Sequence, residues 1–187
     1  QHLLERQSVQ DLNQTDDCKD SLREIARQVD RCKEIVKKLL SLARQMNPVI
    51  QDVDVNSVLR TIISLAQREA AEKHIEIVGE LDPALPIVSS DPPLLRQVFL
   101  NLLVNATQAV EHGGSIVVTS RMNETDGFEI DVRDNGSGIT PEHLGKIFTP
   151  FFSTKPEGKG TGLGLAMSRG IVERLGGRIT VSSEPGV

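Results

Sequence analysis

Two asparagines on one helical face are the first residues whose types and spacing could do chemistry. Asn101 and Asn105 stand four residues apart in an apolar stretch, so both side chains point the same way if that stretch is a helix. The amide oxygen of Asn105 could bind a hard cation such as Mg²⁺, which would bridge phosphate groups. An amide that only bonds within the core is the alternative for Asn105 taken alone.

Two glycine-rich turns supply a second set of candidates. The first, 134–138, follows an alternating strand pattern, and the second, 160–164, runs directly into a helical pattern. Glycine permits tight turns and close approach of a ligand, and N–H groups at a helix start favour anions. Asp134 could accept a hydrogen bond from the exocyclic amine of a purine, or it could simply form the turn. Neither turn has the spacing of a dinucleotide-binding fingerprint or of a Walker P-loop. The residues between the turns look like a movable flap.

The bulk properties exclude several classes of protein. The chain has 187 residues, 38% of them hydrophobic and 25% charged, which fits a soluble globular domain with one additional element. A net charge of −5 argues against nucleic acid as the main partner. No apolar run approaches the roughly 20 residues of a membrane span, and there is no signal peptide. Cys18 and Cys32 do not make a disulfide framework. We expect a cytoplasmic fragment of a longer protein, whose membrane anchoring is left open.

The chain divides at Asn47-Pro48, where the proline breaks a long helix. Residues 1–48 are expected to be part of a helical hairpin, with its second helix at about 17–46, and residues 49–187 a compact domain. The helix carries an apolar seam at heptad spacing, formed by Leu22, Ile25, Val29, Cys32, Val36 and Leu39. One helix cannot bury this seam alone, so it needs partners from upstream chain, from a second copy, or from both. We expect a dimerisation helix and a homodimer. An ordinary long helix lying on its own domain is the alternative.

Residues 49–187 mix strand and helix patterns. We expect strands at 53–55, 75–80, 115–121, 128–133 and 178–183, and helices from a cap at Asn56 to 73, from a cap at Asp91 to 111, and at 163–175. Consecutive antiparallel strands among helices predict an α+β class, an α/β sandwich with the helices on one face of a mixed sheet.

Four segments in a fixed order are far more specific than any of them alone. They read Asn101-Leu102-Leu103-Val104-Asn105-Ala106, Asp134-Asn135-Gly136-Ser137-Gly138-Ile139, Ile147-Phe148-Thr149-Pro150-Phe151-Phe152, and Gly160-Thr161-Gly162-Leu163-Gly164-Leu165. This series resembles the N, G1, F and G2 boxes of the sensor histidine kinases of two-component systems, most of all the nitrogen-regulator type. Residues 31–44 also resemble the second dimerisation helix of that family.

The resemblance implies a site for ATP and Mg²⁺. By it, Asn105 binds Mg²⁺, Asn101 lies near the phosphates, Asp134 recognises the adenine amine, and Lys155 approaches the triphosphate. Asn101, Asn105 and Lys155 form the implied catalytic set. The implied nucleotide-binding set is Asn101, Asn105, Asp134, Gly136, Gly138, Ile139, Phe148, Phe152, Lys155, Lys159, Gly160, Thr161, Gly162, Leu163 and Gly164. Residues 137–161 become a nucleotide lid, with Phe148 as its apolar anchor. The γ-phosphate would pass to a histidine and then to an aspartate of a response-regulator receiver domain.

The family's phosphoacceptor histidine is not expected among the histidines of this chain, with His2 as the alternative. His2, His74, His112 and His143 all lack its sequence context, so the acceptor is expected upstream of this fragment. The resemblance extends to ATP-hydrolysing relatives of the topoisomerase and chaperone types, which carry a general-base Glu where this chain has Asn101. An amide cannot take a proton from water, which favours phosphoryl transfer over hydrolysis. Anti-sigma serine kinases, and a binding module that has lost ATP, are further alternatives.

Overall fold

The chain forms two compact units, 1–46 and 47–187, which are described separately. The computed structural model describes residues 19, 21–30, 32, 33, 36, 48–123, 127–155 and 160–185. In the first unit, residues 21–30 are helical. The seam residues Leu22, Ile25 and Val29 are 60%, 58% and 60% exposed. Val36 and Cys32 are exposed too, and Leu39 lies outside the described residues. The described residues of the apolar seam are therefore exposed, and the homodimer stays a prediction.

The second unit is built on a three-stranded mixed sheet. Its order is β2-β4-β5, with β2 parallel to β4 and β4 antiparallel to β5. The strands are β2 (Glu76–Leu81), β4 (Ser115–Met122) and β5 (Phe128–Asp134). A separate antiparallel pair consists of β1 (Gln51–Val53) and β3 (Val88–Ser90). The long connection from β2 to the parallel strand β4 contains a helix, as parallel pairing requires.

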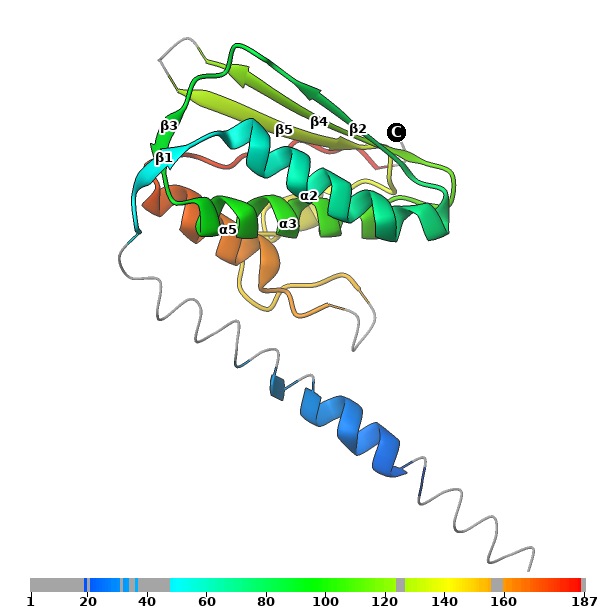
Figure 1. The fold of residues 1–187 in the computed structure, drawn as a ribbon. Coiled ribbons are helices and arrows are strands. Elements are labelled where there is room, and N and C mark those ends of the chain that lie inside the picture. Colours follow the sequence, from blue (N-terminus) through cyan, green and yellow to red (C-terminus); the bar gives the residue numbers. More distant parts are fainter. Residues whose placement is uncertain are drawn as a thin grey trace, which may run out of the picture. The chain divides into compact units, whose positions relative to one another are not determined.

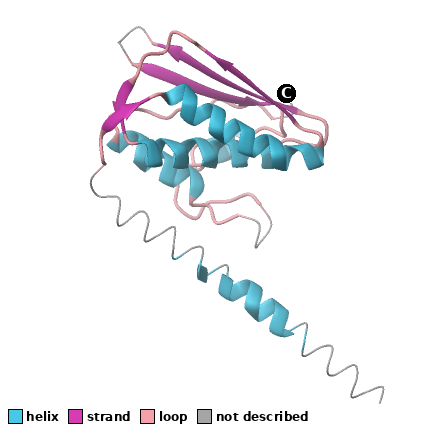
Figure 2. Cartoon of the chain, viewed as in Figure 1, coloured by secondary structure: helices cyan, strands magenta, loops and turns pink. Residues whose placement is uncertain are grey.

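Helices cover one face of this sheet. They are α2 (Val55–Ala70), continued by the 3₁₀ turn η1 (Ala71–Lys73), then α3 (Pro92–Ala109) and α5 (Gly164–Arg174). Figure 1 shows α2, α3 and α5 on the same side of β2, β4 and β5, and Figure 2 shows the helical and strand layers separately. The α+β sandwich is confirmed. A short helix, α4 (Pro141–Leu144), lies between β5 and α5.

The core lies between the sheet and the helices. Alternate residues of β4, Ile116 and Val118, are fully buried because they face the helical layer. Leu59 and Ile62 of α2 and Leu103 of α3 close the core from the other side, with 0%, 1% and 1% exposure. The apolar face of α3 thus holds it firmly against the sheet, while its other face is free to carry polar groups.

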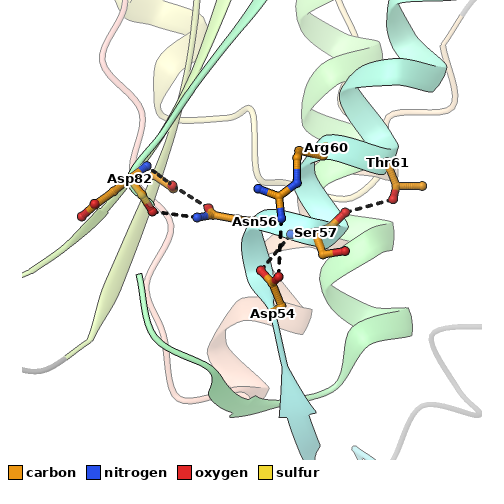
Figure 3. Close-up of polar contacts among 7 residues, drawn as sticks. Asp54, Asn56, Ser57, Arg60, Thr61 and Asp82 are labelled. Atoms are coloured by element: carbon orange, nitrogen blue, oxygen red, sulfur yellow. Dashed lines mark hydrogen bonds and ion pairs between the residues drawn. The ribbon is translucent and has the colours of Figure 1, made fainter. Parts of the chain in front are cut away.

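The start of α2 differs from the sequence prediction. The first strand is 51–53 rather than 53–55, and Asp54 caps the helix by accepting a hydrogen bond from the Ser57 N–H at 2.9 Å. Asn56 is instead a buried residue of the first turn. Figure 3 shows its side chain directed toward Asp82. Its Nδ2 donates to the Asp82 carbonyl at 2.7 Å, and its Oδ1 accepts from the Ser120 hydroxyl at 2.7 Å. Asn and Asp are comparable caps, so only the long-range partners of Asn56 decide between them.

The predicted strand at 178–183 is wrong, because those residues form no strand. A side chain rather than a backbone ladder holds this segment: the Ser183 hydroxyl accepts a hydrogen bond from the Ile139 N–H at 2.8 Å. Alternation alone predicted the strand, but a strand also needs a neighbour to pair with. Among the described helices, none is long and apolar enough to cross a membrane.

Asp91 ties the start of α3 to the chain that leads into the domain. It is 6% exposed and accepts hydrogen bonds from Leu94 N–H at 3.0 Å and Val49 N–H at 2.8 Å. We expect Asp91→Ala to lower the free energy of unfolding by about 2 kcal/mol, since a cap and a second bond are lost. The exposed cap Asp54, which also forms an exposed ion pair with Arg60 at 3.5 Å, provides the control, and Asp54→Ala should cost about 1 kcal/mol. Urea denaturation followed by circular dichroism measures both; equal losses would show that the Val49 bond contributes nothing.

Candidate functional site

The polar face of α3 positions the two predicted asparagines. Asn101 donates from Nδ2 to the Gly164 carbonyl at 3.3 Å and to the buried Ser168 hydroxyl at 3.4 Å. Gly164 is the first residue of α5. The N box and the last glycine box, far apart in sequence, are therefore joined by the Asn101 side chain. This brings the N-terminus of α5 against the amide face of α3.

Asn105 lies one turn further along the same face and is half-buried. A Cβ placed on Gly164 would be 3.9 Å from both Asn101 Oδ1 and Asn105 Nδ2, so the start of α5 faces both amides. Within the described part of the chain, no protein group forms a hydrogen bond with the Asn105 side chain. A half-buried amide can be satisfied by water, so this side chain is available to water or to a ligand.

The first glycine turn abuts the C-terminal end of α3. Asp134, the last residue of β5, accepts a hydrogen bond from Gly136 N–H at 3.0 Å through Oδ1. A Cβ on Gly136 would come within 2.6 Å of the Ala109 carbonyl oxygen, so only glycine fits there. Ala109 follows Asn105 by four residues and shares its face. The turn bearing Asp134 thus stands at the end of the amide face, and its exposed carboxylate keeps Oδ2 unbonded among the described residues.

Gly162 closes the base of the predicted lid. Its φ is +64°, and a Cβ there would lie 2.4 Å from the Phe151 carbonyl carbon. Its carbonyl accepts a hydrogen bond from the Phe151 N–H at 2.9 Å. Phe151 itself has a φ of +67° and is 63% exposed, a strained conformation for a bulky residue. The F box and the last glycine box therefore meet backbone to backbone.

The lid is anchored differently from the sequence prediction. Ile147 is the buried residue, 8% exposed, whereas Phe148 is half-buried with the Arg169 guanidinium 5.6 Å from its ring centroid. Phe152 is half-buried and its ring lies 5.5 Å from that of His143. In Figure 1 the segment before α5 projects from the helical layer on the side away from the sheet. Lys159 lies outside the described residues.

Lys155 reaches back from the lid to α3. Its Nζ donates a hydrogen bond to Oε1 of Gln108, and burial lowers the pKa of its ammonium group below the usual value. Gln108 was not among the predicted site residues. The sequence could nevertheless have indicated Gln108, because positions 101, 105 and 108 share one helical face.

Some of the predicted site residues lie on or beside this face, and others do not. Asn101, Asn105, Asp134, Gly136, Gly164 and Lys155 are linked by the contacts described above. Ile139 is instead bonded through its N–H to Ser183, and a Cβ on Gly138 would meet the Glu184 carbonyl oxygen at 2.3 Å. Leu163, 1% exposed, packs in the interior, while Gly160 and Thr161 are half-buried beside the lid base.

Comparison with known proteins gives consistent results. The family described as histidine kinase-, DNA gyrase B-, and HSP90-like ATPase matches residues 90–187. Over 162 residues the chain is 41% identical to the sensor histidine kinase ZraS of Klebsiella oxytoca, covering 87% of this chain and 35% of ZraS. The catalytic domain of histidine kinase ThkA, nucleotide-free, superposes with a TM-score of 0.61 at 32% identity, covering 67% of this chain and 81% of that domain. Full-length ShkA in complex with AMPPNP gives a TM-score of 0.76 at 30% identity, covering 84% of this chain and 34% of ShkA.

The chain therefore belongs to the family of histidine kinase-, DNA gyrase B- and HSP90-like ATPases. Within this family its similarity is to the catalytic domains of sensor histidine kinases, which supports the kinase interpretation over the topoisomerase or chaperone type. The nucleotide of such a domain is ATP. The chain spans about a third of the length of ZraS, so the activity of the whole protein is treated below as a proposal.

Proposed function

We propose that residues 47–187 bind Mg-ATP along the amide face of α3 and donate its γ-phosphate to a histidine outside this fragment. The observation that carries the proposal is the half-buried amide of Asn105, which faces the start of α5 and has no hydrogen-bond partner among the described residues. The N-terminus of α5 offers N–H groups and a partial positive charge to phosphates. Asp134, at the far end of the same face, would accept a hydrogen bond from the adenine amine.

Each residue has a distinct role in this proposal. Asn105 would hold Mg²⁺ through its amide oxygen, a ligand type that suits this hard cation. When bound, Mg²⁺ neutralises charge on the phosphates. The Lys155 ammonium approaches the triphosphate from the lid, and its partial burial strengthens any charge interaction that it makes. The Phe151–Gly162 contact holds the lid base, from which the lid excludes water during transfer.

Asn101 favours transfer over hydrolysis. By the family resemblance it occupies the place of the general-base Glu of the hydrolysing relatives. Its Nδ2 already bonds to Gly164 and Ser168, so Asn101 braces α5 against α3 instead of activating water. An amide has no proton-accepting capacity near neutral pH, which leaves an incoming nucleophile as the better acceptor of the phosphate.

The proposed partners come from the relatives and from the uncovered seam. Histidine kinase ThkA has been solved in complex with the response regulator TrrA, and ThkA in that complex is 28% identical to this chain with a TM-score of 0.67. This complex suggests a receiver domain as the partner that receives the phosphate from the histidine. The exposed heptad residues Leu22, Ile25 and Val29 suggest a homodimer. A cytoplasmic location would supply the ATP and Mg²⁺.

Mg-ATP binding by the 187-residue chain tests the site. We expect Asn105→Ala and Asp134→Ala each to weaken binding about 10- to 100-fold, because each removes an interaction with a charged group or a hydrogen bond that fixes the base. Isothermal titration calorimetry measures the affinities. Asp131→Ala, an exposed carboxylate on the same strand, is the matched control and should bind like the unaltered chain. If neither site change weakens binding, the site is elsewhere.

Phosphoryl transfer tests the activity. An upstream fragment of the same protein, containing its histidine, should become labelled from γ-labelled ATP when mixed with this chain. The unaltered chain alone should hydrolyse ATP slowly. Steady hydrolysis without transfer to the histidine would instead support the ATPase alternative.

A further inference from the structure

We propose that Gln108 is a positioning residue that holds the lid lysine, Lys155, beside the amide face of α3 before nucleotide binds and releases it to the phosphates afterwards. The release step rests on the function proposed above, whereas the holding contact can be tested without nucleotide.

The contact joins a rigid helix to the lid. Gln108 lies near the C-terminal end of α3, three residues after Asn105, and its Oε1 accepts a hydrogen bond from Lys155 Nζ. The backbone of Lys155 is held as well, because its N–H donates to the Ser153 hydroxyl at 3.2 Å. A Cβ on Gly160 would lie 3.3 Å from Lys155 Cδ, so the second glycine turn packs along the aliphatic stem. The lysine is therefore positioned at its backbone, its stem and its ammonium group.

The neutral amide of Gln108 is suited to holding the Lys155 ammonium group only until nucleotide binds. Within the described residues, Lys155 forms no ion pair with a carboxylate, and its hydrogen-bond acceptor is a neutral amide. A carboxylate would neutralise the ammonium charge and compete with a triphosphate for it. An amide oxygen orients the ammonium group yet leaves its full positive charge for a stronger acceptor. Phosphate oxygens are such acceptors, so incoming nucleotide can displace the amide.

The partial burial of Lys155 predicts how the affinity for nucleotide depends on pH. Desolvation lowers the pKa of Lys155 in the free chain, so the lysine loses its proton at a lower pH than an exposed lysine does. Contact with phosphate favours the charged form and raises that pKa again. Affinity for nucleotide should therefore fall as the pH rises through the pKa of the free chain, with one proton taken up on binding in that range.

The experiment uses the whole chain with ¹³C-labelled lysines and follows their side-chain signals by NMR across the alkaline range. Lys155→Met assigns the Lys155 signal. In the absence of nucleotide we expect Gln108→Glu to raise the pKa of Lys155 and Gln108→Met to change both its pKa and its chemical shift. Lys146, an exposed lysine paired with Glu142, should give the same signal in all variants and serves as the internal control.

Mg-ATP provides the second readout. Gln108→Met should weaken Mg-ATP binding about 2- to 10-fold, because the hydrogen bond that positions Lys155 is lost. Gln108→Glu should weaken it at least tenfold and shift the alkaline loss of affinity to higher pH, which a purely structural role of Gln108 would not do. Addition of Mg-ATP should move the Lys155 signal in the unaltered chain.

The outcomes separate the two proposals. If Lys155 titrates identically in the unaltered chain and in both Gln108 variants, the holding contact does not exist. If Mg-ATP binds but leaves the Lys155 signal unchanged, release to the phosphates is overturned while the nucleotide site survives. If Mg-ATP does not bind the unaltered chain, the proposed function and the release step fall together, and the nucleotide-free titration alone decides the holding contact.

Discussion

Gly162→Ala is expected to weaken Mg-ATP binding more than 100-fold. Alanine at a left-handed φ costs roughly 1–2 kcal/mol, and its Cβ would overlap the carbonyl carbon of Phe151 at 2.4 Å. Backbone atoms cannot move aside as a flexible side chain can, so the turn 160–164 and the lid base must separate. The start of α5 would then no longer face Asn105, and the binding-competent arrangement would be rarely populated. Calorimetric titration with Mg-ATP measures the loss.

The matched control lies in the same lid. A Cβ on Gly145 would meet nothing within 4 Å, and its φ of −67° suits alanine. Gly145→Ala should therefore bind Mg-ATP like the unaltered chain. Circular dichroism should show that Gly162→Ala retains its sheet and helices, because the clash lies outside the core between β4 and α2. Unchanged affinity in Gly162→Ala would mean that the lid base is not part of the nucleotide site.

Leu103→Ala is expected to have the largest effect on stability, a loss of about 3 kcal/mol. Leu103 is 1% exposed and lies in the packed interior of the domain, so its truncation removes buried apolar surface and leaves a cavity. Because Leu103 is on the opposite face of α3 from Asn101 and Asn105, the affinity for Mg-ATP should stay close to that of the unaltered chain. Urea denaturation measures the free energy of unfolding.

Leu100→Ala provides the control on the same helix with the same change of chemistry. Leu100 is 43% exposed, so its truncation should change the free energy of unfolding by no more than about 0.5 kcal/mol. Equal losses at the two positions would contradict the division of α3 into a core face and an outer surface. A large loss of Mg-ATP affinity in Leu103→Ala, at temperatures where the protein is folded, would show that the faces are coupled.

These two predictions reflect the two tasks of α3. Its apolar residues are locked between α2, α5 and the sheet, and its amides stand one turn apart on the remaining face. A helix fixed in this way holds Asn101 and Asn105 at a constant spacing. The proposed site therefore combines α3 and the turn after β5 with the segment that the Phe151–Gly162 hydrogen bond joins to the start of α5.

The relation between sequence and structure is clearest at the ends of α2 and α3. The cap at Asp91 was predictable, because a capping residue is followed directly by Pro92 and an apolar periodic run. The cap of α2 was misplaced by two residues, since Asp54 and Asn56 are equally suitable locally. The Asn56 side chain instead forms hydrogen bonds with Asp82 and Ser120, which lie 26 and 64 residues away in the sequence. The prediction of a strand at 178–183 was wrong for a related reason. Alternation of apolar and polar residues indicates which side chains share a face, but it does not indicate whether a neighbouring strand is there to pair with.

By itself, the sequence determined the α+β class, the order of the four boxes and most of the elements, because periodicity, caps and turn residues act over short distances. It also predicts a separate heptad helix, within which residues 21–30 are helical in the structure. Only the tertiary structure decided which side chains meet. Asn101 donates a hydrogen bond to the Gly164 carbonyl, and Lys155 donates one to Gln108. Ile147 is buried, whereas Phe148 is half-buried. The Asn101–Gly164 and Gln108–Lys155 hydrogen bonds join residues that are 63 and 47 positions apart. Local propensity carries no information about them, since they exist only when the packed core brings the segments together.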